Sequence, residues 1–246
     1  MKLIITKDYE AMSKLAAMSL LGEIYKGKFE RINISITGGK TPVRMYEFIK
    51  PFMDGNTFDR VHYYNFDEIP TKNGPGLTID SLNKMFFEVN NISKEQIEIF
   101  NEENYINYDQ KIKDDGGIDY MVLGLGPDGH FCGNLRGTLN GFEEGCKAVS
   151  NNLSEKLHDR IAFLCGGEEN MCENYVTFGP KTVMGVKKLV MIVNGKHKAK
   201  ILRDILTKPI DEYNPSTILT LHPNFTIICD EDAASLLDEE TIKKYK

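Results

Sequence analysis

Hydrophobic and polar residues follow two spacings that alternate along almost the whole chain. Some segments are apolar at every second position, or throughout about four to eight residues, which is typical of strands. The predicted strands are residues 1–6, 32–37, 61–66, 97–100, 118–125, 175–178, 189–193 and 225–229. Between them, apolar residues recur every three or four positions, which is typical of amphipathic helices. The predicted helices include a first one that ends at Gly27, one that begins at residues 41–42 and a short one after residue 180. The others are residues 77–89, 104–115, 196–206 and 233–244.

This alternation predicts an α/β fold with a mainly parallel sheet and helices on both of its faces. The length of 246 residues suits one large domain, and no repeat, low-complexity tract or linker divides the chain, so we expect a single domain over residues 1–246. Residues 131–167 are rich in Gly and Asn and have the least regular pattern. We interpret them as a long functional loop, a lid-like insertion, and not as a second core.

The composition narrows the classes of function. The chain has 30 Lys and Arg against 36 Asp and Glu, a net charge of -6, which argues against a nucleic-acid partner. The charge does not exclude a phosphorylated small molecule as the ligand, because a few local cations suffice to bind one. No apolar run approaches the roughly 20 residues of a membrane span, and the first residues lack the pattern of a signal peptide, so no membrane partner is expected. The five cysteines include no C-x-x-C pair, which favours free thiols and a cytoplasmic protein.

Clusters of polar residues follow four of the predicted strands. They are residues 37–41, 65–68, 126–130 and 194–198. The carboxyl ends of parallel strands lie at one edge of a sheet, and ligands of such folds bind there. We therefore expect these four clusters to converge on one site.

The first cluster, Thr37-Gly38-Gly39-Lys40-Thr41, lies between a strand and a helix. Consecutive glycines let the backbone approach an anion, and a helix N-terminus offers free N–H groups. The spacing fails for a Walker A loop, whose first glycine would fall at Ile34, and for a G-x-G-x-x-G dinucleotide loop. The cluster predicts a phosphate site for a smaller molecule, with a ligand-free Gly-Gly turn as the alternative.

Two further clusters carry acid–base groups. Asp67 and Glu68 follow a strand, and since side chains alternate along a strand, one can face a pocket as a general base while the other makes structural hydrogen bonds. Asp128 and His130 flank a glycine after a buried strand, where an imidazole can exchange protons near neutral pH. No G-x-S-x-G elbow and no H-x-x-x-H pair occurs, so neither a serine nucleophile nor a metal site is predicted.

The last cluster places Lys196, His197 and Lys198 near the start of a helix. Cations are unfavourable at that end of the helix dipole. Their presence indicates either an anion held nearby or ordinary surface charge, and the sequence leaves both readings open.

In this order, the four clusters resemble those of the family of glucosamine-6-phosphate deaminases (isomerases) and 6-phosphogluconolactonases, nearest to its branch of glucosamine-6-phosphate isomerases. The matching stretches, which span most of the chain, are residues 36–42, 65–68, 124–130, 195–199, 219–223 and 229–231. The resemblance implies a modified Rossmann-like three-layer sandwich, a small sugar phosphate as partner, and no cofactor. The implied reaction converts glucosamine 6-phosphate to fructose 6-phosphate and ammonia.

The resemblance also implies a role for each candidate residue. Asp67 would move a proton between C1 and C2 of the open-chain sugar, and His130, oriented by Asp128, would assist ring opening. The residues that would hold the sugar phosphate are Thr37, Gly38, Gly39, Lys40, Thr41 and Lys198. The family's phosphate-binding Arg is not located by these motifs, and Arg136 and Arg160 are the candidates.

One position departs from the family pattern. The deaminases carry Glu seven positions after the Asp of the Asp-Gly-His motif, and here Leu135, which cannot ionise, follows the matching Asn134. Three functions therefore stay open, led by a deaminase-type sugar-phosphate isomerase. The others are a 6-phosphogluconolactonase-type hydrolase and a non-catalytic protein that binds a sugar phosphate. The sequence also leaves open whether the chain forms a homo-oligomer.

Overall fold

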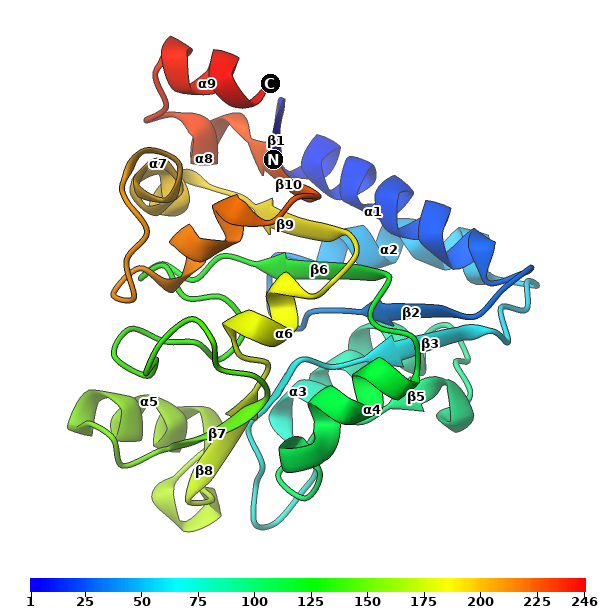
Figure 1. Ribbon diagram of the computed structural model, residues 1–246. Helices are drawn as coiled ribbons and strands as arrows, with labels where there is room; N and C mark the ends of the chain where they lie inside the picture. The colour runs from blue at the N-terminus through cyan, green and yellow to red at the C-terminus, as the bar shows by residue number, and fades with distance from the viewer.

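The computed structural model describes every residue of the chain, 1–246, and is built on a seven-stranded sheet (Figure 1). All neighbouring strands pair in parallel. In spatial order they are β1 (Lys2–Thr6), β10 (Phe225–Asp230), β9 (Leu189–Val193), β6 (Tyr120–Gly124), β2 (Ile32–Ser35), β3 (Val61–Tyr64) and β5 (Ile97–Glu98). The prediction of an α/β fold with a parallel sheet is confirmed.

Helices cover both faces of this sheet, because its central strands are apolar on both sides. In β9, for example, Leu189 and Met191 belong to one buried core, and Val190 and Ile192 belong to the other. The first core is covered by α4 (Tyr108–Asp114), α6 (Pro180–Met184), α7 (Ala199–Thr207), α8 (Glu231–Ala234) and α9 (Glu239–Tyr245). The second is covered by α1 (Tyr9–Lys26), α2 (Val43–Met53) and α3 (Leu77–Leu82). The result is a three-layer sandwich. None of its helices has the length and hydropathy needed to cross a membrane.

The ends of α1 show how local sequence sets an element. Asp8 caps its start, with a carboxylate oxygen that accepts the backbone N–H of Ala11 at 2.8 Å. The helix ends at the predicted Gly27. A Cβ at position 27 would lie 2.2 Å from a methyl group of Val61, so this glycine also lets the helix end pack against β3.

A second, antiparallel sheet lies beyond the carboxyl edge of the first, at the lower left of Figure 1. Its strands are β4 (Asp67–Glu68), β8 (Asn174–Thr177) and β7 (Lys147–Ser150), and α5 (Glu155–Cys165) packs beside them. The interpretation of residues 131–167 as a long loop and not a second core is therefore wrong, since β7 and α5 fall within them and pack into a small core of their own. The lid-like role of this stretch stays a prediction.

The helix α5 has clear sequence signals. The hydroxyl of Ser154 accepts the N–H of Leu157 at 3.3 Å, and Gly166 ends the helix in the left-handed region with φ 80°. Apolar side chains four residues apart, including Leu157 and Ile161, pack into a small core of eight buried residues shared with β7 and β8. We call this core, with α5, β7 and β8, the small module.

Several predicted helices are divided. Residues 77–89 form α3 followed by a π-turn at Asn83–Phe87, and residues 104–115 form a 3-10 turn at Tyr105–Asn107 followed by α4. The predicted closing helix is split into α8 and α9, because Asp238 caps a new helix by accepting the N–H of Thr241 at 2.7 Å. These breaks change the boundaries and leave the layer arrangement as predicted.

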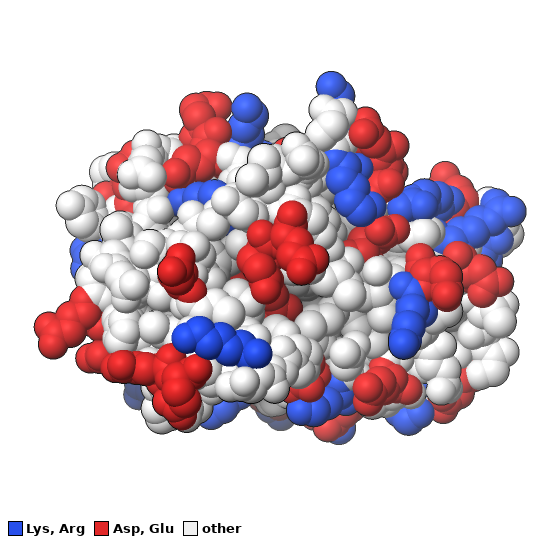
Figure 2. Space-filling view, turned by 90° about the horizontal axis from the view of Figure 1, so that it is seen from below, with Lys and Arg blue, Asp and Glu red and all other residues white.

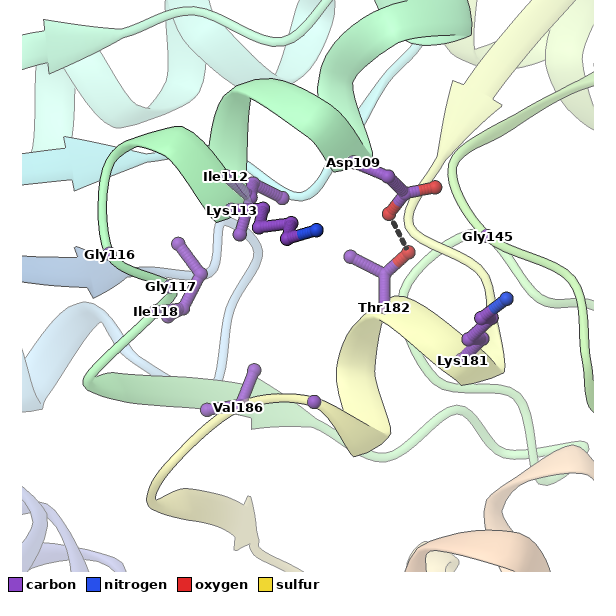
Figure 3. A pocket seen from close by; sticks show the side chains of 11 residues that line it. Asp109, Ile112, Lys113, Gly116, Gly117, Ile118, Gly145, Lys181, Thr182 and Val186 are labelled. Carbon is purple, nitrogen blue, oxygen red and sulfur yellow. Dashed lines mark hydrogen bonds between the residues drawn. The ribbon is translucent and has the colours of Figure 1, made fainter.

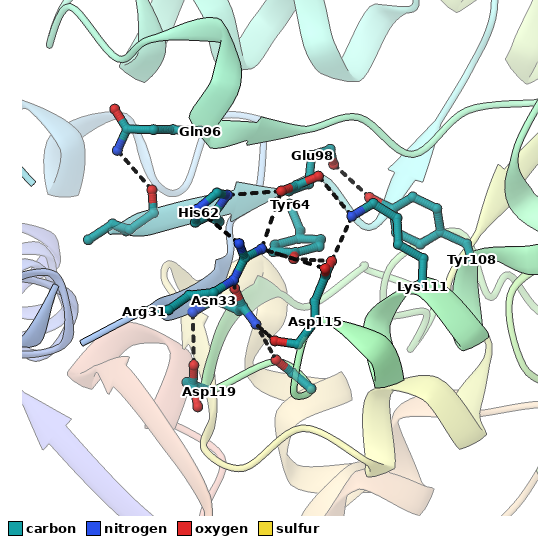
Figure 4. A network of polar contacts seen from close by, with 12 residues as sticks. Arg31, Asn33, His62, Tyr64, Gln96, Glu98, Tyr108, Lys111, Asp115 and Asp119 are labelled. Atoms are coloured by element: carbon teal, nitrogen blue, oxygen red, sulfur yellow. Dashed lines mark hydrogen bonds and ion pairs between the residues drawn. The ribbon is translucent and has the colours of Figure 1, made fainter. Parts of the chain in front are cut away.

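A polar network fixes the sheet near the starts of β2 and β3, opposite the edge that carries the candidate site (Figure 4). The guanidinium of Arg31 lies 3.3 Å from the carboxylate of Glu98 and 3.7 Å from that of Asp115. Lys111 lies 2.8 Å and 2.6 Å from the same two carboxylates, and His62 bonds Glu98 at 2.8 Å. Since its charges are paired within the network, we assign it a structural role.

Candidate functional site

The predicted site residues converge on one cavity of about 800 Å³ at the carboxyl ends of β2, β6 and β9. It is lined by all but one of them: Thr37, Gly38, Gly39, Lys40, Thr41, Asp67, His130 and Lys198. The exception, Asp128, lies behind the lining and bonds His130. The four polar clusters of the sequence are therefore neighbours in space. We call this cavity the main cavity.

The Gly38-Gly39 segment leads from β2 into α2 and forms one wall of the main cavity. Gly39 has φ 92°, a backbone conformation that favours glycine. Carbonyl groups of the segment are already bound, since the hydroxyl of Tyr46 donates to Thr37 O at 2.7 Å and that of Tyr9 donates to Thr41 O at 3.0 Å. Lys40 is exposed and forms no ion pair with a protein carboxylate. The wall thus combines a cation with the start of a helix, which suits an anion.

Asp67 and Glu68 point to different sides, as expected of neighbours in a strand. The buried carboxylate of Glu68 accepts three backbone N–H groups, from Ile69 at 2.9 Å, Thr78 at 2.8 Å and Ile79 at 3.0 Å. It thereby caps the start of α3. Gly76 leaves room for it, because a Cβ at position 76 would lie 2.2 Å from the carboxyl carbon of Glu68.

Asp67 instead faces the main cavity. Its only side-chain partner is the Thr78 hydroxyl, which donates to Oδ1 at 3.1 Å. Burial raises the pKa of Asp67 to about 6, and the hydrogen bond from Thr78 opposes that rise. A carboxyl group with a pKa close to neutral can both accept and release a proton, which is the requirement for a proton shuttle.

His130 lines the main cavity from a tight turn that follows β6. A Cβ at Gly126 would lie 2.0 Å from its Nδ1, so a glycine there is what lets the ring lie against the turn. Nδ1 is hydrogen-bonded to the carboxylate of Asp128, and no protein group bonds Nε2. Burial disfavours the charge of Asp128, but the hydrogen bond and charge of His130 outweigh it and hold the pKa of Asp128 well below its ordinary value.

Two cations, Lys198 and Arg160, lie near this pair. Lys198 donates a hydrogen bond to the carbonyl of Leu125, and burial lowers its pKa; nearby Asp128 opposes the shift, while Arg160 adds to it. Of the two Arg candidates, Arg160 lines the main cavity and lies 3.9 Å from the Asp128 carboxylate. Arg136 lies outside this lining and stacks on Tyr213, with 5.4 Å between its guanidinium carbon and the ring centre.

Some lining residues were not predicted. Thr78 and Ser81 come from α3, and Cys132 lies two residues after His130. His197 also lines the cavity and belongs to the predicted cluster 194–198. Cys132 has φ 49°, unusual for a residue other than glycine, and such conformations concentrate at functional sites. No sequence pattern links α3 to this edge, because its start is placed there by the hydrogen bonds of Glu68 and not by the sheet.

A separate cavity of about 640 Å³ lies between α4 and α6, and none of the predicted site residues lines it (Figure 3). Its one carboxylate, on Asp109, already accepts the hydroxyl of Thr182 at 2.6 Å and the N–H of Cys146 at 2.7 Å. Nowhere in the chain do three or more His, Cys, Asp or Glu side chains form a group that could hold a metal ion. The face shown in Figure 2 carries both signs of charge interspersed, without a broad basic surface.

Comparison with known proteins agrees with the geometry. The family model of glucosamine-6-phosphate isomerases/6-phosphogluconolactonase matches residues 7–227. Glucosamine-6-phosphate deaminases of Thermoanaerobacter pseudethanolicus and Clostridium perfringens are each 32% identical, covering 99% and 96% of this chain and 98% and 100% of those proteins.

Solved structures show the same arrangement. A monomeric glucosamine-6-phosphate deaminase has a TM-score of 0.82 at 26% identity, covering 96% of this chain and 100% of that one. A 6-phosphogluconolactonase from Trypanosoma cruzi has a TM-score of 0.73 at 17% identity, with 96% of each chain covered, which shows a shared fold. With the family model spanning most of its length and these relatives matching it from end to end, the chain belongs to the glucosamine-6-phosphate isomerase/6-phosphogluconolactonase family.

Proposed function

We propose that the chain is a sugar-phosphate isomerase of the deaminase type, which converts glucosamine 6-phosphate, or a close relative, to a ketose 6-phosphate and releases ammonia. The observation that carries the proposal is the position of Asp67, a carboxylate that faces the main cavity with its pKa raised to about 6. Relatives named glucosamine-6-phosphate deaminase, similar over nearly the full length, support the substrate class. The predicted cytoplasmic location stays a prediction.

In this proposal the Gly38-Gly39 wall, Lys40 and Lys198 bind the phosphate. Asp67 then removes the proton from C2 of the open-chain sugar and returns it to C1, which turns the amine at C2 into an iminium that water hydrolyses. Nε2 of His130, free of protein partners, is in place to exchange a proton with the sugar's ring oxygen. Each step uses a group that lines the main cavity.

Lactone hydrolysis is the second candidate, and Leu135 is the observation that favours it. Leu135 is buried beside the site, so Asp128 is the one carboxylate that bonds His130. A His–Asp pair suffices to activate water. A panel of amino-sugar, ketose and lactone 6-phosphates, followed by NMR and an ammonia assay, separates the two. Ammonia release from glucosamine 6-phosphate supports the isomerase, whereas lactone hydrolysis without ammonia release supports the lactonase.

The pH dependence of kcat/KM should report Asp67. Its pKa of about 6 lies above the ordinary aspartate value of about 3.9, and a general base works only when ionised. We therefore expect kcat/KM to fall about tenfold per pH unit below pH 6, and not only below pH 4. The substrate phosphate also titrates near pH 6, so binding of a non-reacting sugar-alcohol phosphate, measured over the same range, corrects for it. A corrected profile that is flat between pH 5 and 7 would contradict the assignment.

Replacing Lys198 by Met should weaken sugar-phosphate binding about 10- to 100-fold, because a hydrogen bond to a charged group contributes about 1.5–3 kcal/mol. Lys196 provides a matched control, since it lies two residues away, is exposed and does not line the main cavity. Calorimetry with glucosamine 6-phosphate measures both variants. Equal affinities for Lys198→Met and Lys196→Met would show that Lys198 does not hold the phosphate.

A further inference from the structure

A smaller cavity of about 150 Å³ opens beside the main cavity, and the two share lining residues that include Asp67, His130 and Arg160. We call it the side pocket. Its walls are mostly apolar and are made by Ile69, Cys132, Leu135, Ile161, Leu164 and Tyr175. Of these, Leu135, Ile161 and Tyr175 belong to the core of the small module. The main cavity thus has an apolar extension next to its catalytic carboxylate.

The side pocket lies at one end of the site. None of the residues of the Gly38-Gly39 wall lines it, and neither does Lys198. Asp67 lines both cavities, so a sugar whose phosphate is bound at that wall and whose C2 lies at Asp67 has its C1 and C2 next to the side pocket. The substituent on C2, which is the nitrogen in an amino sugar, is one of the groups that can enter it.

The two hydroxyl groups that line the side pocket are already bound within the protein. The hydroxyl of Thr78 donates to Asp67 at 3.1 Å, and that of Tyr175 donates to Gly133 O at 2.7 Å. Burial raises the pKa of Cys132 well above its ordinary value, so its thiol is neutral. The charged and imidazole groups of the lining, on Asp67, His130 and Arg160, are all shared with the main cavity. An apolar substituent that enters the side pocket would replace water against its apolar walls.

We propose that the side pocket accepts a small alkyl group on the nitrogen of the substrate, so that the chain acts on N-alkylamino sugar phosphates. The inference rests on the proposed function. The space is sufficient, since an apolar cavity of about 150 Å³ can hold a molecule as large as benzene.

The reaction balances without a further reagent. Asp67 takes the C2 proton, the electron pair forms the C1–C2 double bond, and the aldehyde oxygen takes a proton from the solvent and becomes a hydroxyl; the later hydrolysis of the iminium returns that proton. Return of the proton to C1 leaves an iminium between C2 and the alkylated nitrogen. Water adds to C2 and the C2–N bond breaks, so the products are a ketose phosphate and an alkylamine in place of ammonia.

The test compares glucosamine 6-phosphate with its N-methyl and N-ethyl derivatives on the full chain, by calorimetry and by kcat/KM with NMR detection of the ketose and the amine. We expect the N-ethyl compound to bind about tenfold more tightly than glucosamine 6-phosphate, the effect of burying two carbons. Leu164 is 44% exposed and lines the side pocket, so Leu164→Gln places a polar group in its wall. In this variant the preference for the N-ethyl compound should fall below threefold. Phe163→Gln is the matched control, because Phe163 is 83% exposed on the same helix and does not line the side pocket.

Equal or weaker binding of the N-ethyl compound in the unchanged protein overturns the proposal. So does an equal loss of preference in Leu164→Gln and Phe163→Gln. If none of the three compounds is turned over, the proposed function fails, while the ratio of their dissociation constants still decides what the side pocket accepts.

Discussion

Replacing Asp67 by Asn will lower the turnover of glucosamine 6-phosphate by about 100- to 10,000-fold, the usual contribution of a general base. Asn has the same shape, and its amide oxygen can still accept the hydroxyl of Thr78 that Asp67 now binds at 3.1 Å. It cannot take up the C2 proton. Affinity for the sugar phosphate should therefore stay within about threefold, since the phosphate is bound at the other end of the main cavity. Steady-state kinetics and calorimetry measure the two effects.

The stability of this variant provides a control. The pKa of Asp67 is about 6 in the folded chain and about 3.9 in an unfolded one. Burial therefore disfavours the ionised form of Asp67, and its ionisation at pH 7 lowers the stability of the folded chain. Asn removes that penalty, and Asp67→Asn should unfold at the same or a higher temperature than the unchanged protein. A variant that keeps normal turnover would rule out Asp67 as the proton shuttle.

Replacing the adjacent Glu68 by Ala will, unlike Asp67→Asn, destabilise the fold, with a loss of about 3–5 kcal/mol in the free energy of unfolding. The carboxylate of Glu68 is 2% exposed and accepts three backbone N–H groups, and each buried donor left without an acceptor costs about 1–3 kcal/mol. The first turn of α3 would then lose its cap and become less stable. Urea unfolding followed by circular dichroism measures the loss.

Two further variants make the result specific. Glu68→Gln keeps one acceptor oxygen and should lose less stability than Glu68→Ala. Glu103→Ala removes an exposed carboxylate outside the site and should change the free energy of unfolding by less than about 0.5 kcal/mol. A loss below about 1 kcal/mol in Glu68→Ala would mean that α3 does not depend on this cap. Turnover should fall in Glu68→Ala as well, because Thr78 positions Asp67 from the first turn of α3.

The large sheet could be predicted from the sequence because each of its strands carries its own signal. Residues 189–193 are apolar throughout, and all five are buried between helices on both faces. In the small sheet only β8 carries such a signal, in residues 175–178. Its strand β4 has only two residues, Asp67 and Glu68, and their pairing with β8 is set by tertiary contact and not by periodicity. The helix α5 had usable signals in Ser154 and Gly166, which the Gly-rich and Asn-rich surroundings obscured.

The same distinction applies to the site. Residues at the ends of large-sheet strands, such as His130 and the Gly38-Gly39 wall, were predictable because parallel strands end at one edge. Thr78 was not, and Arg160 was only one of two candidates, because both reach the main cavity from helices whose positions depend on hydrogen bonds and packing between distant segments. The choice between Arg136 and Arg160 could be made only in three dimensions.

The separate core of the small module has a consequence for how this scaffold can diversify. Its side chains shape the side pocket, whereas His130, Lys198 and the Gly38-Gly39 wall are held by the large sheet. Asp67 and Arg160 are tied to the module, through the pairing of β4 with β8 and through α5, so only some of its positions can vary without touching the reaction centre. Leu135 and Ile161 line the side pocket and not the main cavity. A library randomised at these two positions would sample new substrates while the groups that line the main cavity stay unchanged, which makes them a practical starting point for directed evolution.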